Sequence, residues 1–164
     1  MTLAITTLSC KGNQEDAVIE YGVTSGILKE SVESTQKLIN RITEYVLALK
    51  SNNNMAVNTD ELKQLLATSN SNLKSSISNL EVVQDSDNDI QYRSKTLAYL
   101  KLFHSFTENE IPEFIRLLET DTNNKYEKGS KIISTKLTEI KAAEIEMEKA
   151  KNDLLEKYNI TIEY

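Results

Sequence analysis

The chain has 164 residues, about the length of one domain, and a formal net charge of −6 at pH 7. It contains four glycines, one proline and no tryptophan, so it has few of the residues that form the tight turns of β-sandwiches and β-barrels. The acidic balance argues against a nucleic-acid partner, and the single cysteine, Cys10, excludes an internal disulfide framework.

The first twelve residues are expected to form an extended N-terminal arm. Leu3 and Ile5 alternate with Thr2, Ala4 and Thr6, a period of two that is typical of a strand with one buried face. No stretch of the chain approaches 18 consecutive apolar residues, so we expect no transmembrane segment.

A long first helix is predicted from Gln14 to Lys50, with Ile27–Lys50 as its most regular part. Apolar and small residues recur there in alternating steps of three and four, which is the heptad pattern of a coiled coil. The predicted seam consists of Val18, Tyr21, Ser25, Leu28, Val32, Thr35, Ile39, Ile42, Val46 and Leu49. Gly22 and Gly26 each weaken a helix interior by about 1 kcal/mol, so they either break the helix or admit a close neighbour.

A second helix is predicted to begin after Thr59, which is a favourable N-cap residue followed by two acids. Its seam is Leu62, Leu66, Ser69, Leu73, Ser76, Leu80 and Val83. Between Gln64 and Leu80 the only charge is Lys74. The helix is therefore either a central member of a bundle, whose small polar residues let its neighbours approach, or a helix that meets a partner.

An acidic loop follows, with Asp85, Asp87 and Asp89 at alternate positions. This spacing is found at the start of a calcium-binding EF-hand loop, but Ile90 and Thr96 stand where that loop needs Gly and Glu. A solvated loop, with Asp87 or Asp89 as N-cap of the next helix, explains the acids better.

A third helix is predicted from Asp89 to about Thr107 and a fourth from Glu110 to Thr120. Pro112 lies near their junction. If Asn109 is the N-cap of the fourth helix, the proline falls at its third position and costs no helical hydrogen bond. A bend is therefore expected near the junction.

The last helix is predicted from Ser130 to about Tyr158, with an apolar stripe and an ionic opposite face. Residues 159–164 alternate like a strand and are expected to form an extended C-terminal tail. In a bundle with an even number of helices both termini lie at one end, so this tail could pair with Leu3–Leu8 as a short ribbon.

The sequence contains few of the residue patterns that are typical of catalytic sites. The one histidine, His104, lies among Leu100, Phe103 and Phe106 and is expected at the edge of the core. The sequence contains no Gly-x-Ser-x-Gly elbow, no Glu-x-x-His pair and no nucleotide-binding glycine spacing. We therefore predict no catalytic residue, no metal site and no cofactor.

Together these patterns predict one all-α domain spanning residues 1–164, an elongated up-and-down bundle of four to five helices with long antiparallel members. The expected function is non-enzymatic protein interaction through helix–helix contacts, with a protein partner or a second copy, in a soluble protein for which the cytoplasm is favoured over export. The candidate interaction surface is Ser69, Leu73, Ser76, Ile77, Leu80, Gly22 and Gly26. The alternatives are an exported helical protein of a toxin or secretion system acting at a membrane, and an enzyme using carboxylates in a bundle core.

Overall fold

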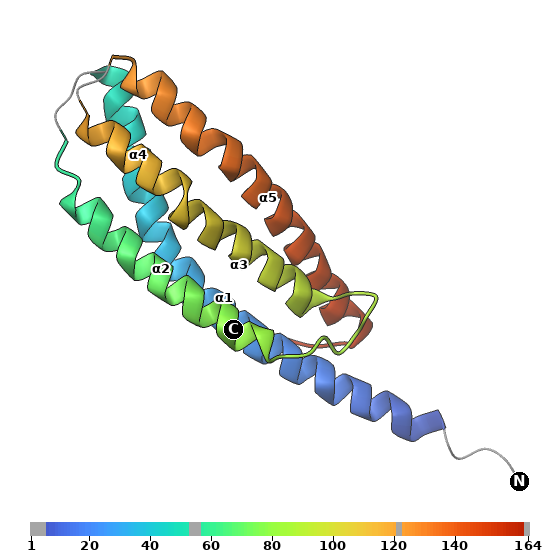
Figure 1. Ribbon diagram of the computed structural model, residues 1–164. Coiled ribbons are helices and arrows are strands. Elements are labelled where there is room, and N and C mark those ends of the chain that lie inside the picture. The colour runs from blue at the N-terminus through green and yellow to red at the C-terminus, as the bar shows by residue number, and fades with distance from the viewer. Residues whose placement is uncertain (1–5, 53–56, 121–122, 163–164) are drawn as a thin grey trace, which may run out of the picture.

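A computed structural model describes the backbone of residues 6–52, 57–120 and 123–162, and side chains from residue 13 onward. The five helices are α1 (Thr6–Ser51), α2 (Asp60–Glu81), α3 (Tyr92–Glu108), α4 (Glu110–Glu119) and α5 (Lys125–Lys157), with no strand in these ranges. They run up and down along one long axis, with α4 continuing α3 as a bent rod (Figure 1). The predicted all-α bundle of four to five helices is confirmed.

Helix α1 sets the length of the molecule. Its 46 residues span about 70 Å at roughly 1.5 Å per residue, and its first turns extend beyond the other helices (Figure 1). The helix continues through Gly22 and Gly26 without a break. Residues 6–12, expected in an extended arm, are also helical. The described residues include no strand to pair with them, and a helix satisfies its own backbone hydrogen bonds.

The predicted ribbon between the two ends of the chain is not formed in the described residues. Of its N-terminal half, residues 6–8 belong to α1, and the rest lies outside the described residues. At the other end, residues 160–162 follow α5 without pairing as a strand, and Glu163 and Tyr164 are again outside. An isolated two-stranded ribbon is only marginally stable in water, which is the physical reason that a helix prevails here.

The seam of α1 differs from the predicted one at Val18 and Val32, whereas the predicted Ser25, Ile39 and Val46 are half-buried. Tyr21, Leu28, Thr35, Ile42 and Leu49 face the bundle as expected. The buried residues between them, however, are Ala17, Thr24, Ser31 and Leu38.

The predicted seam residues Val18 and Val32 are exposed. The small side chains at 17, 24 and 31 allow close helix packing. The hydroxyl groups of Ser31 and Thr35 donate to the carbonyls of Ile27 and Ser31, at 3.2 and 2.9 Å, so their burial leaves no donor unpaired.

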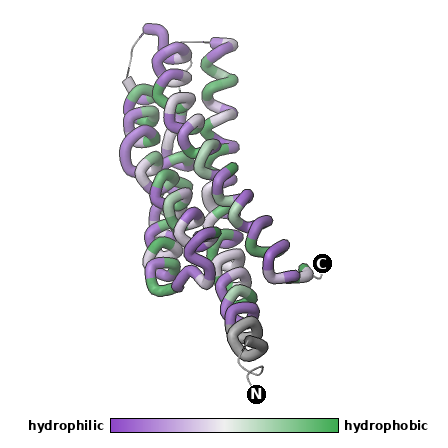
Figure 2. Tube along the Cα trace, turned by 90° about the vertical axis from the view of Figure 1, so that its right-hand side faces the viewer, coloured by the Kyte–Doolittle hydropathy of each residue, from purple (hydrophilic) through white to green (hydrophobic). Residues whose placement is uncertain are grey.

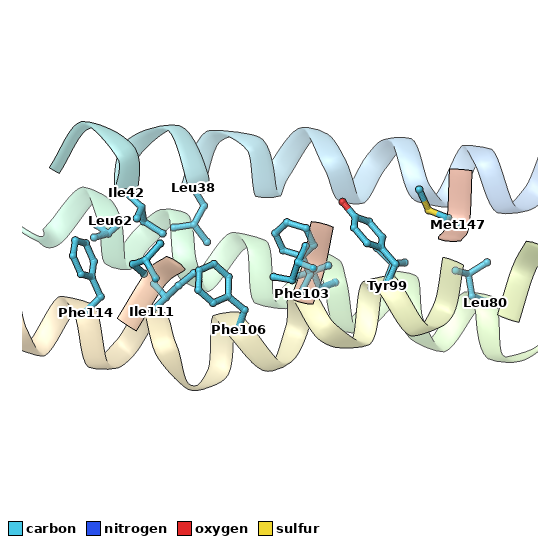
Figure 3. Packing of buried hydrophobic residues seen from close by; sticks show 14 of the residues in the cluster. Leu38, Ile42, Leu62, Leu80, Tyr99, Phe103, Phe106, Ile111, Phe114 and Met147 are labelled. Carbon is cyan, nitrogen blue, oxygen red and sulfur yellow. The ribbon is translucent and has the colours of Figure 1, made fainter. Parts of the chain in front are cut away.

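The core runs the length of the bundle and is richest in aromatic rings where α3 bends into α4. Figure 3 shows Phe106, Ile111 and Phe114 pointing toward Leu38 and Ile42 of α1 and Leu62 of α2. Every helix alternates hydrophobic and hydrophilic residues along its length (Figure 2), as expected for amphipathic helices that share one core.

One stripe of α2 lies inside this core. Leu62, Leu73 and Leu80 are fully buried, and the hydroxyl of Ser69 donates to the carbonyl of Ser34 on α1 at 3.0 Å. The opposite side of α2 is exposed and carries Ala67, Thr68, Ser71, Asn72, Ser75, Ser78 and Asn79, so burial within the bundle does not account for its lack of charge.

The helix boundaries follow local hydrogen bonds that sequence patterns only partly reveal. Thr59 precedes α2 as predicted, but its hydroxyl donates to Glu119 Oε1 at 2.6 Å, while the side-chain oxygen of Asn58 accepts the N–H of Asp60 at 2.9 Å. Helix α5 begins five residues before the predicted Ser130, after Asn124 in the left-handed region at φ 62°.

The bend between α3 and α4 is confirmed. Asn109 lies between the two helices, and Pro112 is the third residue of α4. At that position a helical N–H has no intrahelical partner, so proline is tolerated. Asn109 itself makes no side-chain cap bond; its amide donates back to the carbonyl of Ser105 at 2.8 Å.

Replacing a helical glycine by alanine should have opposite effects on stability at Gly129 and at the two glycines of α1, Gly22 and Gly26. A Cβ added at Gly129 would lie 2.8 Å from Cε2 of the buried Phe114 ring, whereas one added at Gly22 or Gly26 would meet nothing within 4 Å. Gly129→Ala should therefore lower the free energy of unfolding by about 1–3 kcal/mol. Gly22→Ala and Gly26→Ala should each raise it by up to about 1 kcal/mol.

Urea unfolding followed by circular dichroism measures these changes. The two α1 variants serve as controls for the effect of alanine on helix propensity alone. A Gly129→Ala protein as stable as the parent would contradict the close approach of α4 and α5.

Candidate interaction surface

One end of the bundle is held together by a buried carboxylate of α1. Glu20 is 2% exposed. Its oxygens accept the backbone N–H and the hydroxyl of Ser86 at 2.7 and 2.5 Å, and the backbone N–H of Arg93 at 2.9 Å. Glu20 therefore joins α1 both to the loop after α2 and to the start of α3.

The start of α3 is capped by two acids from outside the helix. Its N-cap residue, Gln91, has a left-handed backbone at φ 58° and makes no side-chain cap bond. Asp85 instead accepts the N–H of Ser94 at 3.0 Å and the hydroxyl of the same residue, beside the contact from Glu20. Two carboxylates thus satisfy free N–H groups at the positive end of the helix dipole. The predicted caps, Asp87 and Asp89, do not have this role.

Asp87 is buried rather than solvated, being 7% exposed. It accepts hydrogen bonds from the N–H groups of Asp89 and Ile90 at 3.0 and 3.3 Å, from the Tyr158 hydroxyl at 2.9 Å, and from the Lys157 ammonium. The hydrogen bond from Lys157 is the main reason that the pKa of Asp87 falls to about 2. Asp87 therefore fastens the end of α5 to the α2–α3 loop.

Beside the hydrogen bonds of Glu20 and Asp87, the exposed side of α1 carries apolar and small residues that no other helix covers in the described part of the chain. Ile19 is 62% exposed and Val23 is 42% exposed. With Val83 they line a hollow of about 430 Å³ between α1 and the α2–α3 loop. Gly22 and Gly26 are exposed on the same helix, at 100° per residue on the side turned away from Ala17. We call Ile19, Gly22, Val23 and Gly26 the α1 face.

The structure separates the predicted interaction surface into two groups. Ser69, Leu73, Ser76 and Leu80 are buried within the bundle and Ile77 is half-buried, so α1 and the other helices of the same chain already cover them. Gly22 and Gly26 are accessible. Sequence reasoning missed Ile19 and Val23, whose spacing of four was a usable signal, because the predicted seam placed Val18 and Val32 inside.

The chemistry available for catalysis is limited in the described residues. Their buried carboxylates are Glu20 and Asp87, each with its own set of donors, and no group of three or more His, Cys, Asp and Glu residues in these ranges could hold a metal ion. His104 is partly exposed, with Nδ1 3.5 Å from a Glu108 carboxylate oxygen one helical turn away.

Comparison with known proteins adds no relative: neither a protein-family model, nor a curated protein, nor a solved structure matches the chain. Within the described residues, no helix has the length and apolar character needed to cross a membrane.

Removing the charge of Glu20 should loosen the end of the bundle that carries the α1 face. Glu20→Gln replaces one acceptor oxygen by an amide group that faces N–H and O–H donors. We expect it to lower the free energy of unfolding by about 1–3 kcal/mol, measured by urea titration. Glu15→Gln, on an exposed and unpaired neighbour, is the control and should change stability by less than about 0.5 kcal/mol. If Glu20→Gln and Glu15→Gln changed the free energy of unfolding by the same amount, the anchoring role of Glu20 would be refuted.

The contribution of Asp87 should depend on pH. Because its pKa is lowered from 3.8 to about 2 in the folded chain, its ionised form stabilises the fold above about pH 4, and this contribution disappears as the pH falls toward 2. Asp87→Asn should therefore lower the free energy of unfolding by about 1–2 kcal/mol at neutral pH, a value reduced by solvent around the half-exposed Lys157. The difference between the two proteins should vanish near pH 2, as measured by chemical unfolding across pH. A difference that does not change with pH would contradict the assignment.

Proposed function

We propose that the chain is a non-enzymatic protein-interaction module that binds its partner through a helix–helix contact on the α1 face. The observation that carries this proposal is the contrast among its helical glycines. Glycine in a helix interior costs about 1 kcal/mol relative to alanine. The cost at Gly129 is explained by packing, since Phe114 occupies the space of a Cβ. None of the described residues occupies that space at Gly22 or Gly26.

Two apolar neighbours make the same face suitable for burial. Ile19 and Val23 are one helical turn apart and both exposed, and removing such side chains from water is a main source of binding free energy. Glycines beside them let a second helix approach closely. The face is also held rigidly, because Glu20 anchors the same turns of α1 to the α2–α3 loop and to the start of α3. A preorganised surface loses little conformational entropy on binding.

A photo-reactive amino acid placed on α1 tests the proposal. Position 30 is exposed beside the α1 face, and position 152, on exposed α5 surface, is the control. We expect adducts of defined mass from position 30 and none from position 152, when the purified chain is irradiated alone or with extract of its source cells.

The adduct should depend on the apolar residues of the face. Ile19→Ser combined with Val23→Ser should abolish it, whereas Ile145→Ser, which also alters an exposed apolar side chain but on α5, should leave it unchanged. Because all three side chains are exposed, stability should change little. Absence of any adduct, or an adduct insensitive to Ile19 and Val23, would refute the α1 face as the binding surface.

A further inference from the structure

A groove between α4 and α5 combines an apolar floor with basic side chains. It has a volume of about 610 Å³. Leu117 and Ile132 are half-buried in it. The exposed lining residues are Glu113, Arg116, Thr120, Lys128, Lys131 and Thr135. The lining residues of α4 and those of α5 recur at the same spacing along their helices, so the groove is about two helical turns long.

The cations of this groove have no partners in the described part of the chain. Arg116, Lys128 and Lys131 make no ion pair there, although the chain has an excess of six negative charges and eight other basic side chains do form ion pairs. Among the described residues that line the groove, Glu113 is the one acid. The groove is therefore an electropositive and partly apolar site on an acidic protein.

The α1 face has the complementary pattern. Exposed acids flank it on both sides, Glu15 and Asp16 before Ile19, and Glu30 and Glu33 after Gly26. None of the four forms an ion pair in the described residues, and Lys29 is the one cation among them. The α1 face carries acids beside apolar and small residues, and the groove carries cations beside an apolar floor, so the two surfaces are complementary in charge and in apolar character.

We propose that the α4–α5 groove binds the α1 face of a second copy of this chain. This inference rests on the proposed function and names the partner of the α1 face. Gly22 and Gly26 would let the docking helix lie close to the floor formed by Leu117 and Ile132, while its acids meet Arg116, Lys128 and Lys131. Opposite charges of this kind set orientation and speed association.

The contact must join different molecules in a head-to-tail order. The groove lies near the C-terminal end of α1, where Glu119 of α4 contacts Thr59 and Lys63 at the start of α2. The α1 face lies toward the opposite end of the same continuous helix (Figure 1). A chain cannot therefore place its own α1 face in its own groove. A bound pair keeps one free groove and one free α1 face, on different copies, so assembly continues into rings or open chains.

Sedimentation of two variants, alone and mixed, tests this assembly. The groove variant carries Arg116→Glu and Lys131→Glu, and the α1 variant carries Ile19→Ser and Val23→Ser. We expect the parent chain to associate as its concentration rises and to associate less at high salt, because exposed charges are screened. Each variant alone should associate at least roughly tenfold more weakly.

The mixture gives the decisive result. The groove variant retains its α1 face and the α1 variant retains its groove, so together they should form a capped species of twice the 18.6 kDa chain mass and nothing larger. Lys74→Glu with Lys149→Glu is the control: it makes the same charge change at exposed lysines without ion pairs elsewhere, and it should associate like the parent.

Three other outcomes would overturn the inference. A parent chain that stays monomeric at all concentrations would exclude a second copy as the occupant, and cross-linking from position 30 to another protein would then still support the proposed function. Association lost in the α1 variant but unchanged in the groove variant would place the partner surface elsewhere. Association unaffected by either variant would exclude both surfaces, and with no adduct from position 30 the proposed function would fail as well.

Discussion

Close packing against small side chains of α1 is the constraint on which the rest of the molecule depends. Apart from its first turns, which extend beyond the other helices (Figure 1), the 46-residue helix α1 packs against shorter helices along its length. Ala17, Thr24 and Ser31, spaced seven residues apart, are buried against these neighbours, where larger residues would hold the neighbours apart. This choice of seam turns Val18, Ile19 and Val23 outward. The packing of the bundle and the exposure of the α1 face therefore have the same cause.

The N-terminal half of α1 offers little apolar contact, and carboxylates compensate for it. Glu20 reaches the loop and the start of α3, and Asp87 ties that loop to the end of α5. Each acid satisfies backbone N–H groups that would otherwise lack partners at a helix start or in a tight loop. What looks in sequence like an acidic, solvated loop is thus part of the framework that holds three helices at one end of the bundle.

Two surfaces of the molecule carry several charges that form no ion pair within the described residues. Arg116, Lys128 and Lys131 line the groove between α4 and α5, and acids flank the α1 face toward the other end. Neither group is needed to hold the bundle together. A protein with complementary surfaces at its two ends has the geometry for repeated head-to-tail contact, and the same surfaces would keep two copies from binding in a symmetric arrangement that brings like charges together.

The sequence by itself determined the fold class, the number of helices and the bend at Pro112, because helical periodicity and the missing N–H of proline are local properties. The ends of the helices were harder to predict from the sequence, because Thr59, Glu20 and Asp85 find their hydrogen-bond partners in other segments of the chain. The side of α1 that faces inward was decided only by tertiary structure. Two stripes one residue apart both fit the heptad pattern, and hydrophobicity favoured the one with Val18 and Val32. The close approach of the neighbouring helices selected the stripe with Ala17, Thr24 and Ser31, and so placed Ile19, Gly22, Val23 and Gly26 in contact with water.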